Sequence, residues 1–226
     1  MSERSQLRRA ATLTEIKAVA RRLLVHDGPS GISLRAIARE MRMTAPALYR
    51  YYAALDSLVI DLCTDLYTEL RAACESARDE VPPDDLLKRL VVMAREFRRW
   101  VLAHPGEAAL MFGPPLPGVE QFAEQCRGFQ EAGARFGRTF LDPILELHNQ
   151  GLVPEGRLEN RLGEAHPELS GLPDAVAAFF LRSWTRLYGV IMAEAFGHLA
   201  WAVADASALF DAELAAIADS LGGETR

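Results

Sequence analysis

Apolar residues recur along this chain at the three- and four-residue spacing of α-helices. The first such stripe begins at Ile16 and continues at residues 19, 20, 23 and 24, which together form one face of a helix. Clear period-two alternation, the mark of a half-buried strand, is missing from the sequence. We therefore predict an all-α protein of about nine helices.

Three short helices are predicted in the N-terminal quarter. The first runs from about Thr12 to His26 and ends at a cluster of Gly, Pro and Ser. Ser33 is placed to cap the second helix, and Thr44 the third. Pro46 falls in the first turn of that third helix, where its missing N–H has no partner to lose. Two short helices joined by a tight turn form a helix-turn-helix, whose second helix enters the DNA major groove.

The rest of the chain is predicted to form mostly longer helices. They cover about residues 56–78, 84–103, 107–112, 119–149, 174–200 and 205–221, and the polar stretch 151–172 is predicted to be a loop. We place the boundary between a helix-turn-helix DNA-binding domain, residues 1–54, and a C-terminal ligand-binding and dimerisation domain, residues 55–226.

Charge is divided unevenly between these two parts. Residues 1–52 hold ten Lys or Arg and four Asp or Glu, a net charge of +6, whereas the remainder holds 15 and 27, a net charge of −12. A basic segment on an acidic body is typical of proteins that bind nucleic acid, because cationic side chains neutralise phosphates. A mildly basic solvated surface is the alternative, and charge alone does not decide between the two.

The third helix is predicted to present a DNA-reading face. With Leu48 and Tyr52 turned inward, a step of 100° per residue puts Pro46 and Arg50 outward. Arg35, at the start of the second helix, is placed to reach a guanine edge or a phosphate. The predicted DNA-binding residues are Ser33, Arg35, Thr44, Ala45, Pro46, Ala47, Tyr49, Arg50 and Tyr51.

The run from Ile32 to Tyr52, ISLRAIAREMRMTAPALYRYY, resembles the head of TetR-family transcriptional regulators, and its Leu-Tyr-x-Tyr-aromatic ending is the most diagnostic part. The resemblance implies a homodimer that binds a palindromic operator, usually as a repressor, and that a small molecule releases. Two positions depart from the family pattern. Arg42 stands where a glycine is common, and an αL conformation would strain it. Leu55 replaces a basic residue that many relatives use to contact a phosphate.

Phenylalanines follow one face of the predicted helix 119–149. The stripe consists of Phe122, Cys126, Phe129, Gly133, Phe136 and Phe140, spaced by three or four residues. Core packing is the alternative for each of them, but Gly133 leaves a gap in the stripe, so we predict an apolar ligand cavity there. The predicted ligand-binding residues are Trp100, His104, Met111, Phe112, Phe129, Phe136, Trp184 and Tyr188.

The last two predicted helices carry more apolar residues than the outer helices of a monomer should. These include Phe179, Phe180, Leu187, Ile191, Leu209, Phe210, Leu214 and Ile217. Burial within one chain explains some of them. We predict that the others pair with a second copy in a four-helix isologous interface.

Several classes of function lack their sequence signals. The five histidines form no HxxxH or HExxH spacing, and GxSxG, GxGxxG and GxxxxGK[ST] are absent, so we expect no enzyme, metal site or cofactor. Cys63, Cys74 and Cys126 are predicted to be small buried hydrophobes. No apolar run is long enough to span a membrane, and no signal peptide is evident, which predicts a cytoplasmic protein.

The sequence thus predicts a ligand-responsive, dimeric transcriptional repressor whose partners are an operator in double-stranded DNA and a small apolar or amphipathic effector. Two alternatives stay open. The first is a helical small-molecule-binding protein or enzyme whose head has lost DNA binding, which the intact run from Thr44 to Tyr52 disfavours. The second is an activator or nucleoid-type binder on the same fold.

Overall fold

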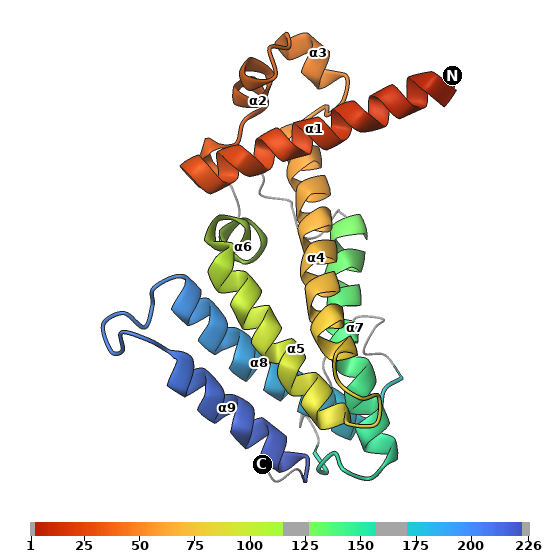
Figure 1. The fold of residues 1–226 in the computed structure, drawn as a ribbon, viewed down its shortest axis with the longest axis vertical. Helices are drawn as coiled ribbons and strands as arrows, with labels where there is room; N and C mark the ends of the chain where they lie inside the picture. The colour runs from red at the N-terminus through yellow and green to blue at the C-terminus, as the bar shows by residue number, and fades with distance from the viewer. Residues whose placement is uncertain (1–2, 115–126, 157–170, 223–226) are drawn as a thin grey trace. The chain divides into compact units, whose positions relative to one another are not determined.

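The computed structural model of the protein describes residues 3–114, 127–156 and 171–222, without the side chains of residues 127–129. Within these ranges the chain is helical and contains no strand, so the all-α prediction is confirmed (Figure 1). The elements are α1 (Glu3–Asp27), η1 (Pro29–Gly31), α2 (Leu34–Glu40), α3 (Ala45–Tyr49), α4 (Leu55–Asp79), α5 (Leu86–Ala103), α6 (Pro105–Phe112), α7 (Arg127–Asn149), α8 (Asp174–Ala195) and α9 (Ser207–Ser220).

Two helix boundaries differ most from those predicted. Helix α1 begins at Glu3, whereas the apolar stripe predicted a start near Thr12. Residues 3–11 are mostly exposed good helix formers, which extend the helix without adding to the stripe. Helix α8 ends at Ala195 and not near residue 200, because Gly197 adopts a left-handed conformation (φ 72°). The N–H of His198 then donates to the carbonyl of Ala193 at 2.8 Å, a common helix ending.

The chain packs as two compact units. The head unit comprises the described residues of 1–67 and 104–132, and the body unit those of 68–103 and 133–226. Helices α4 and α7 therefore contribute residues to both units. This division differs from the predicted boundary at residues 54 and 55, because the first turns of α4 belong to the head unit and α6 packs against α1 and η1.

The head unit is held by a small apolar core around α1. Ile16 of α1, Ile37 of α2, Leu48 of α3 and Leu58 of α4 are completely buried. Helices α2 and α3 lie on one side of α1, and α6 lies on the other (Figure 1). Helix α6 approaches α1 so closely that a Cβ added to Gly106 would lie 3.1 Å from a backbone carbonyl oxygen of α1. A side chain at that position would push the two helices apart.

The body unit packs α5 against α8 and α9, with the second part of α7 beside them (Figure 1). Its core includes Met93 and Phe97 of α5, Phe136 of α7 and Phe210 of α9. Hydrogen bonds from one arginine join three of the helices. Arg98 of α5 binds Glu194 of α8 through two N–H groups, at 2.8 and 2.5 Å, and also donates to Ser207 of α9 at 2.9 Å. Because this pair is mostly shielded from water, it sets the register of α5, α8 and α9.

Candidate nucleic-acid interface and ligand pocket

Helix α3 separates its residues into an inner and an outer face, as the sequence predicts. Leu48 and Tyr52 are buried, whereas Pro46 and Arg50 are exposed and the side chain of Tyr49 is 49% exposed. Ala45, Ala47 and Tyr51 are half-buried at the edges of that face. Thr44 occupies the N-cap position of α3, but its exposed hydroxyl makes no capping hydrogen bond within the helix. Its oxygen and hydrogen are thus open to an external partner.

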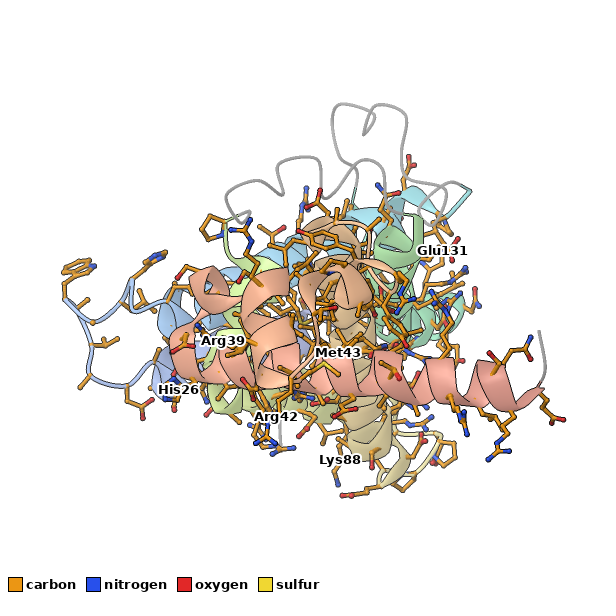
Figure 2. All side chains as sticks on the ribbon, turned by 90° about the horizontal axis from the view of Figure 1, so that it is seen from above. His26, Arg39, Arg42, Met43, Lys88 and Glu131 are labelled. Atoms are coloured by element: carbon orange, nitrogen blue, oxygen red, sulfur yellow. The ribbon has the colours of Figure 1, made fainter. Side chains whose placement is uncertain are left out.

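Exposed arginines flank α3. Arg35 and Arg39 lie four residues apart and therefore on the same face of α2, and neither is buried. Arg42, in the turn between α2 and α3, has a left-handed backbone (φ 53°), so the strain expected at this position is present. Seen from above, Arg39, Arg42 and Met43 lie on one face of the head unit (Figure 2). The predicted DNA-binding set omitted Arg39 and Arg42, although the four-residue spacing from Arg35 was a usable signal for the first.

Ser33 has a structural task in addition to its predicted contact with DNA. Its side-chain oxygen accepts a hydrogen bond from the backbone N–H of Ala36 at 3.1 Å and so caps α2, as the sequence predicts. Ser33 is nevertheless exposed. Its hydroxyl can therefore still donate a hydrogen bond to an external partner.

The start of α1 contacts the two residues that follow α3. The guanidinium of Arg9 lies 5.1 Å from the ring centre of Tyr51 and donates two hydrogen bonds of 3.3 Å to the carbonyl oxygen of Arg50. Arg4 and Arg8 are exposed on the same polar segment of α1. The basic surface therefore continues from α3 onto α1. Sequence reasoning missed this extension because residues 3–11 carry no apolar stripe.

A polar network fixes the first turns of α4 within the head unit. The hydroxyl of Tyr52 donates to Asp61 of α4 at 2.5 Å, and Lys17 of α1 lies 3.5 Å from Asp61 and 2.5 Å from Asp65. Burial, the hydrogen bond to Asp61 and the nearby carboxylates raise the pKa of Tyr52 well above its usual value. Tyr52 thus remains a hydrogen-bond donor at any physiological pH.

Helix α6 is tied to α1 by a second ion pair. Nε of Arg21 lies 3.0 Å from Oε1 of Glu107, and the Glu107 side chain is only 4% exposed. A buried carboxylate of this kind is stabilised only while its cationic partner is present. The pair therefore makes the position of α6 depend on α1, which also carries the helix-turn-helix.

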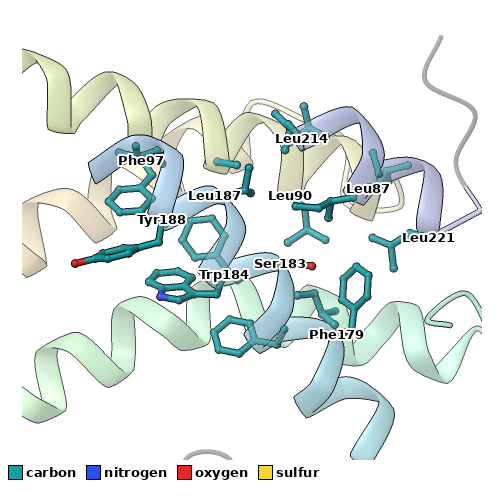
Figure 3. Close-up of a pocket in the computed structure, with 18 residues that line it drawn as sticks. Leu87, Leu90, Phe97, Phe179, Ser183, Trp184, Leu187, Tyr188, Leu214 and Leu221 are labelled. Carbon is teal, nitrogen blue, oxygen red and sulfur yellow. The ribbon is translucent and has the colours of Figure 1, made fainter. Parts of the chain in front are cut away.

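The body unit contains a pocket enclosed by four helices (Figure 3). Helix α5 contributes Leu87 to Phe97, α7 contributes Phe140 and Ile144, α8 contributes Phe179 to Ile191, and the C-terminal segment contributes Leu214 to Leu221. The walls are almost entirely hydrocarbon, which is typical of binding sites for small organic molecules.

The predicted ligand-binding residues are divided by the structure. Trp184 and Tyr188 line the pocket, and Phe136 contacts the Trp184 ring from outside the lining, at 5.7 Å between ring centres. Trp100 is buried elsewhere in the body unit, where its indole N–H donates to Glu69 at 3.3 Å. His104, Met111 and Phe112 belong to the head unit and do not line the pocket. The side chain of Phe129 lies outside the described part of the chain, as do Phe122 and Cys126.

Apolar residues predicted to face a second copy are mostly buried within the chain. Of that set, Leu209 is exposed, Leu187 is half-buried and the other six are buried. Burial within one chain thus explains six of the eight, and pairing with a second copy stays a prediction. The reason is that α8 and α9 turn these residues toward α5 and α7, where they line the pocket or lie beside it: Phe179, Phe180, Leu187, Ile191, Leu214 and Ile217 are lining residues.

The cysteines in the described ranges have no reactive character. Cys63 and Cys74 are buried, and burial raises the pKa of each thiol to about 12. Where side chains are described, no three His, Cys, Asp or Glu residues cluster in a way that could hold a metal ion. None of the described helices has the length and hydropathy needed to cross a membrane.

Two family models match the chain. The model described as "Bacterial regulatory proteins, tetR family" matches residues 16–62, which span the helix-turn-helix and the start of α4. The model described as "Tetracyclin repressor-like, C-terminal domain" matches residues 90–217, more than half of the 226 residues. The first match includes α2 and α3, and the second includes most of the residues that line the pocket.

Similar proteins extend these matches over most of the chain. The HTH-type transcriptional regulator Rv1816 of Mycobacterium tuberculosis is 29% identical over 208 residues, which cover 88% of this chain and 87% of the relative. A crystal structure assigned to a regulatory protein, SCO4313, matches with a TM-score of 0.76 at 28% identity, covering 96% of this chain and 98% of the other. A TetR-family regulator from Marinobacter aquaeolei, at 13% identity and a TM-score of 0.62, shares the fold over 95% of this chain and 97% of its own.

Proposed function

Because this chain belongs to the tetR family of bacterial regulatory proteins, we propose that it is a ligand-responsive transcriptional repressor that binds a palindromic operator as a homodimer. Family membership makes it a transcriptional regulator with a DNA-binding head and not an enzyme. The observation that carries the proposal is the outer face of α3, where Tyr49 and Arg50 are exposed while Leu48 anchors the helix in the core. A cytoplasmic location follows from the proposed partner, operator DNA.

In this proposal α3 enters the major groove and the surrounding arginines position it. Tyr49 and Arg50, together with Pro46 and the edges formed by Ala45 and Ala47, meet base edges and thymine methyl groups. Thr44, Ser33 and the hydroxyl of Tyr51 meet phosphates, and Arg35 meets a guanine edge or a phosphate. Arg39 and the α1 segment with Arg4 and Arg8 add sequence-independent attraction. Leu55, at the start of α4, supplies no charge for a phosphate.

The proposed homodimer forms through α8, α9 and the segment that joins them. This region contains the most exposed large apolar side chain of the described chain, Trp201, at 87%, together with Val203 and Leu209 at about 40%. Exposed apolar groups gathered in one region are typical of interaction surfaces. A second copy that covers them would bring two α3 helices to two half-sites of one operator.

Ligand response is proposed to pass through the elements shared by the two units. Helix α4 is continuous from the head unit into the body unit, and its first turns are fixed to the head by Tyr52, Asp61 and Lys17. A ligand in the body pocket that favours a different tilt of α4 would change the separation of the two α3 helices. Operator affinity would then fall, at most by the factor by which the ligand prefers the tilted state of α4 over the DNA-binding state.

An electrophoretic mobility shift with DNA from directly upstream of the protein's own gene tests the proposal. We expect specific retardation at moderate salt that survives excess nonspecific competitor, and its loss with Tyr49→Ala. If no nearby promoter fragment is specifically retarded, the function as an operator-binding repressor is refuted. Transcription from the retarded fragment separates repressor from activator, because it falls on addition of a repressor and rises with an activator.

A further inference from the structure

Among the described residues, none that lines the pocket of the body unit is charged. None of its eighteen lining residues is acidic or basic, and only Ser183, Trp184 and Tyr188 carry polar side-chain atoms. Arg98 and Glu194, charged residues of the neighbouring turns, are bound to each other. A carboxylate or ammonium group that entered the pocket would lose its hydration without meeting a counter-ion, which is strongly unfavourable.

Aromatic rings form one wall of the pocket around Trp184. The Trp184 ring is nearly parallel to those of Phe97 and Tyr188, at 5.9 and 6.3 Å between ring centres, and meets Phe140 edge-on at 5.6 Å. Burial raises the pKa of Tyr188, which keeps its ring neutral. A flat apolar molecule placed against this wall contacts rings that already hold each other in place, so the wall itself need not be ordered on binding.

Ser183 supplies a hydrogen-bonding group inside the apolar lining. Its hydroxyl lies between the ends of the pocket marked by Tyr188 and by Leu221 (Figure 3). Two residues further along α8, Thr185 returns its hydroxyl to the carbonyl of Leu181 at 2.7 Å, which is the usual arrangement in a helix. In the described part of the chain the Ser183 hydroxyl has no such partner. It is therefore available to a ligand.

We propose that this pocket selects an uncharged ligand with a flat aromatic portion, and that the Ser183 hydroxyl binds one polar group of that ligand. The inference rests on the proposed function, in which the pocket is the effector site. It goes further by naming the chemistry that the effector must have. Carboxylates, phosphates and organic cations of the same shape are excluded.

A series of probes with one ring system and different charge tests this selection. Isothermal titration calorimetry of the full-length protein without DNA is run with 2-naphthol, naphthalene, 2-naphthoate and protonated 2-naphthylmethylamine. We expect naphthalene and 2-naphthol to bind, 2-naphthol about threefold to tenfold more tightly because of one additional hydrogen bond, and both charged probes to bind at least about a hundredfold more weakly. Equal affinity for 2-naphthoate and naphthalene, or no binding of either neutral probe, overturns the proposal.

Two pairs of variants locate the binding. Ser183→Ala should abolish the preference for 2-naphthol over naphthalene and leave naphthalene affinity unchanged, whereas Ser76→Ala, at an exposed serine of α4, should change neither. Leu187→Trp should fill the pocket and weaken both neutral probes about tenfold or more, and Leu102→Trp, outside the pocket, should not. A preference for 2-naphthol that survives in Ser183→Ala overturns the role of that hydroxyl.

Failure of this inference is distinguishable from failure of the proposed function. If the mobility shift shows a specific operator complex but neither neutral probe binds, the pocket chemistry is wrong and operator binding stands. If the probes bind in the expected order but no promoter fragment is retarded, the pocket chemistry stands and its role as an effector site falls.

Discussion

The two candidate recognition surfaces of this protein are built from opposite chemistry. In the head unit, Arg35, Arg39 and Arg50 are exposed on short helices around a small apolar core. In the body unit, long helices line a pocket in which every described lining residue is uncharged. Under the proposed function, this difference keeps the two proposed ligands apart: polyanionic DNA would gain nothing in the pocket, and an apolar effector would gain nothing on the arginine surface.

The largest effect that separates the two surfaces is the effect of salt. Operator affinity should fall about a thousandfold between 50 and 200 mM salt, since a dimer that neutralises several phosphates must release as many counterions. Affinity for naphthalene should change by less than about twofold, because no ion pair forms in the pocket. Parallel titrations of both ligands at the two salt concentrations provide the measurement. If operator affinity and naphthalene affinity depended similarly on salt, the two surfaces would not differ in charge as described.

Removal of one arginine from the head should act on DNA alone. Arg35→Ala is expected to weaken operator binding by about tenfold to a hundredfold, as for the loss of a guanine or phosphate contact. Arg95→Ala, which removes an exposed arginine from α5 of the body unit, is the matched control and should leave operator affinity unchanged. Fluorescence anisotropy of labelled operator gives both values. If Arg95→Ala weakens operator binding as much as Arg35→Ala does, the assignment of DNA binding to the head unit is wrong.

Loss of the Tyr52 hydroxyl should loosen α4 from the head. Tyr52→Phe leaves the carboxylate of Asp61 without its 2.5 Å donor, and we expect a loss of about 1–2 kcal/mol in the free energy of unfolding. Tyr49→Phe removes a hydroxyl from an exposed tyrosine and should cost almost nothing. Urea denaturation followed by circular dichroism measures both. Equal stability of the two variants would mean that the network does not fix α4.

The smallest predicted effect concerns the backbone at Arg42. Arg42→Gly should stabilise the protein by about 0.5–1 kcal/mol, because glycine adopts a φ of 53° without strain. The same variant loses a positive charge from the head and should bind operator slightly more weakly. Arg42→Ala loses the charge but keeps the strain, so thermal denaturation of the two variants separates the effects. Identical melting temperatures would show that this conformation carries no strain.

Most of the helix-turn-helix could be predicted from the sequence because its signals are local. The Ser33 cap, the position of Thr44, Pro46 in the first turn of α3 and the inward direction of Leu48 each depend on residues within one helical turn. The contact of Arg9 with Tyr51 could not be predicted, because it joins residues 42 positions apart. The polar sequence at the start of α1 contains no pattern that predicts a contact with Tyr51.

The pocket depends on which helices face one another, and periodicity does not contain that information. Apolar spacing showed that Phe179, Leu214 and Ile217 share buried faces, but it could not say whether those faces meet a second copy or helices of the same chain. Trp184 and Tyr188 were found because large aromatic residues often line cavities. Ser183 was missed, since a single serine in a helix carries no signal until its neighbours are placed.

Selection of binding sites from a random double-stranded DNA library tests the central claim most directly, because the protein itself picks out the operator sequence from the pool. The account predicts an enriched palindrome whose two half-sites are separated by about one or more helical turns, and no enrichment with Tyr49→Ala. An enriched pool without inverted symmetry, or no enrichment with the wild-type protein under conditions where it is folded, would contradict it.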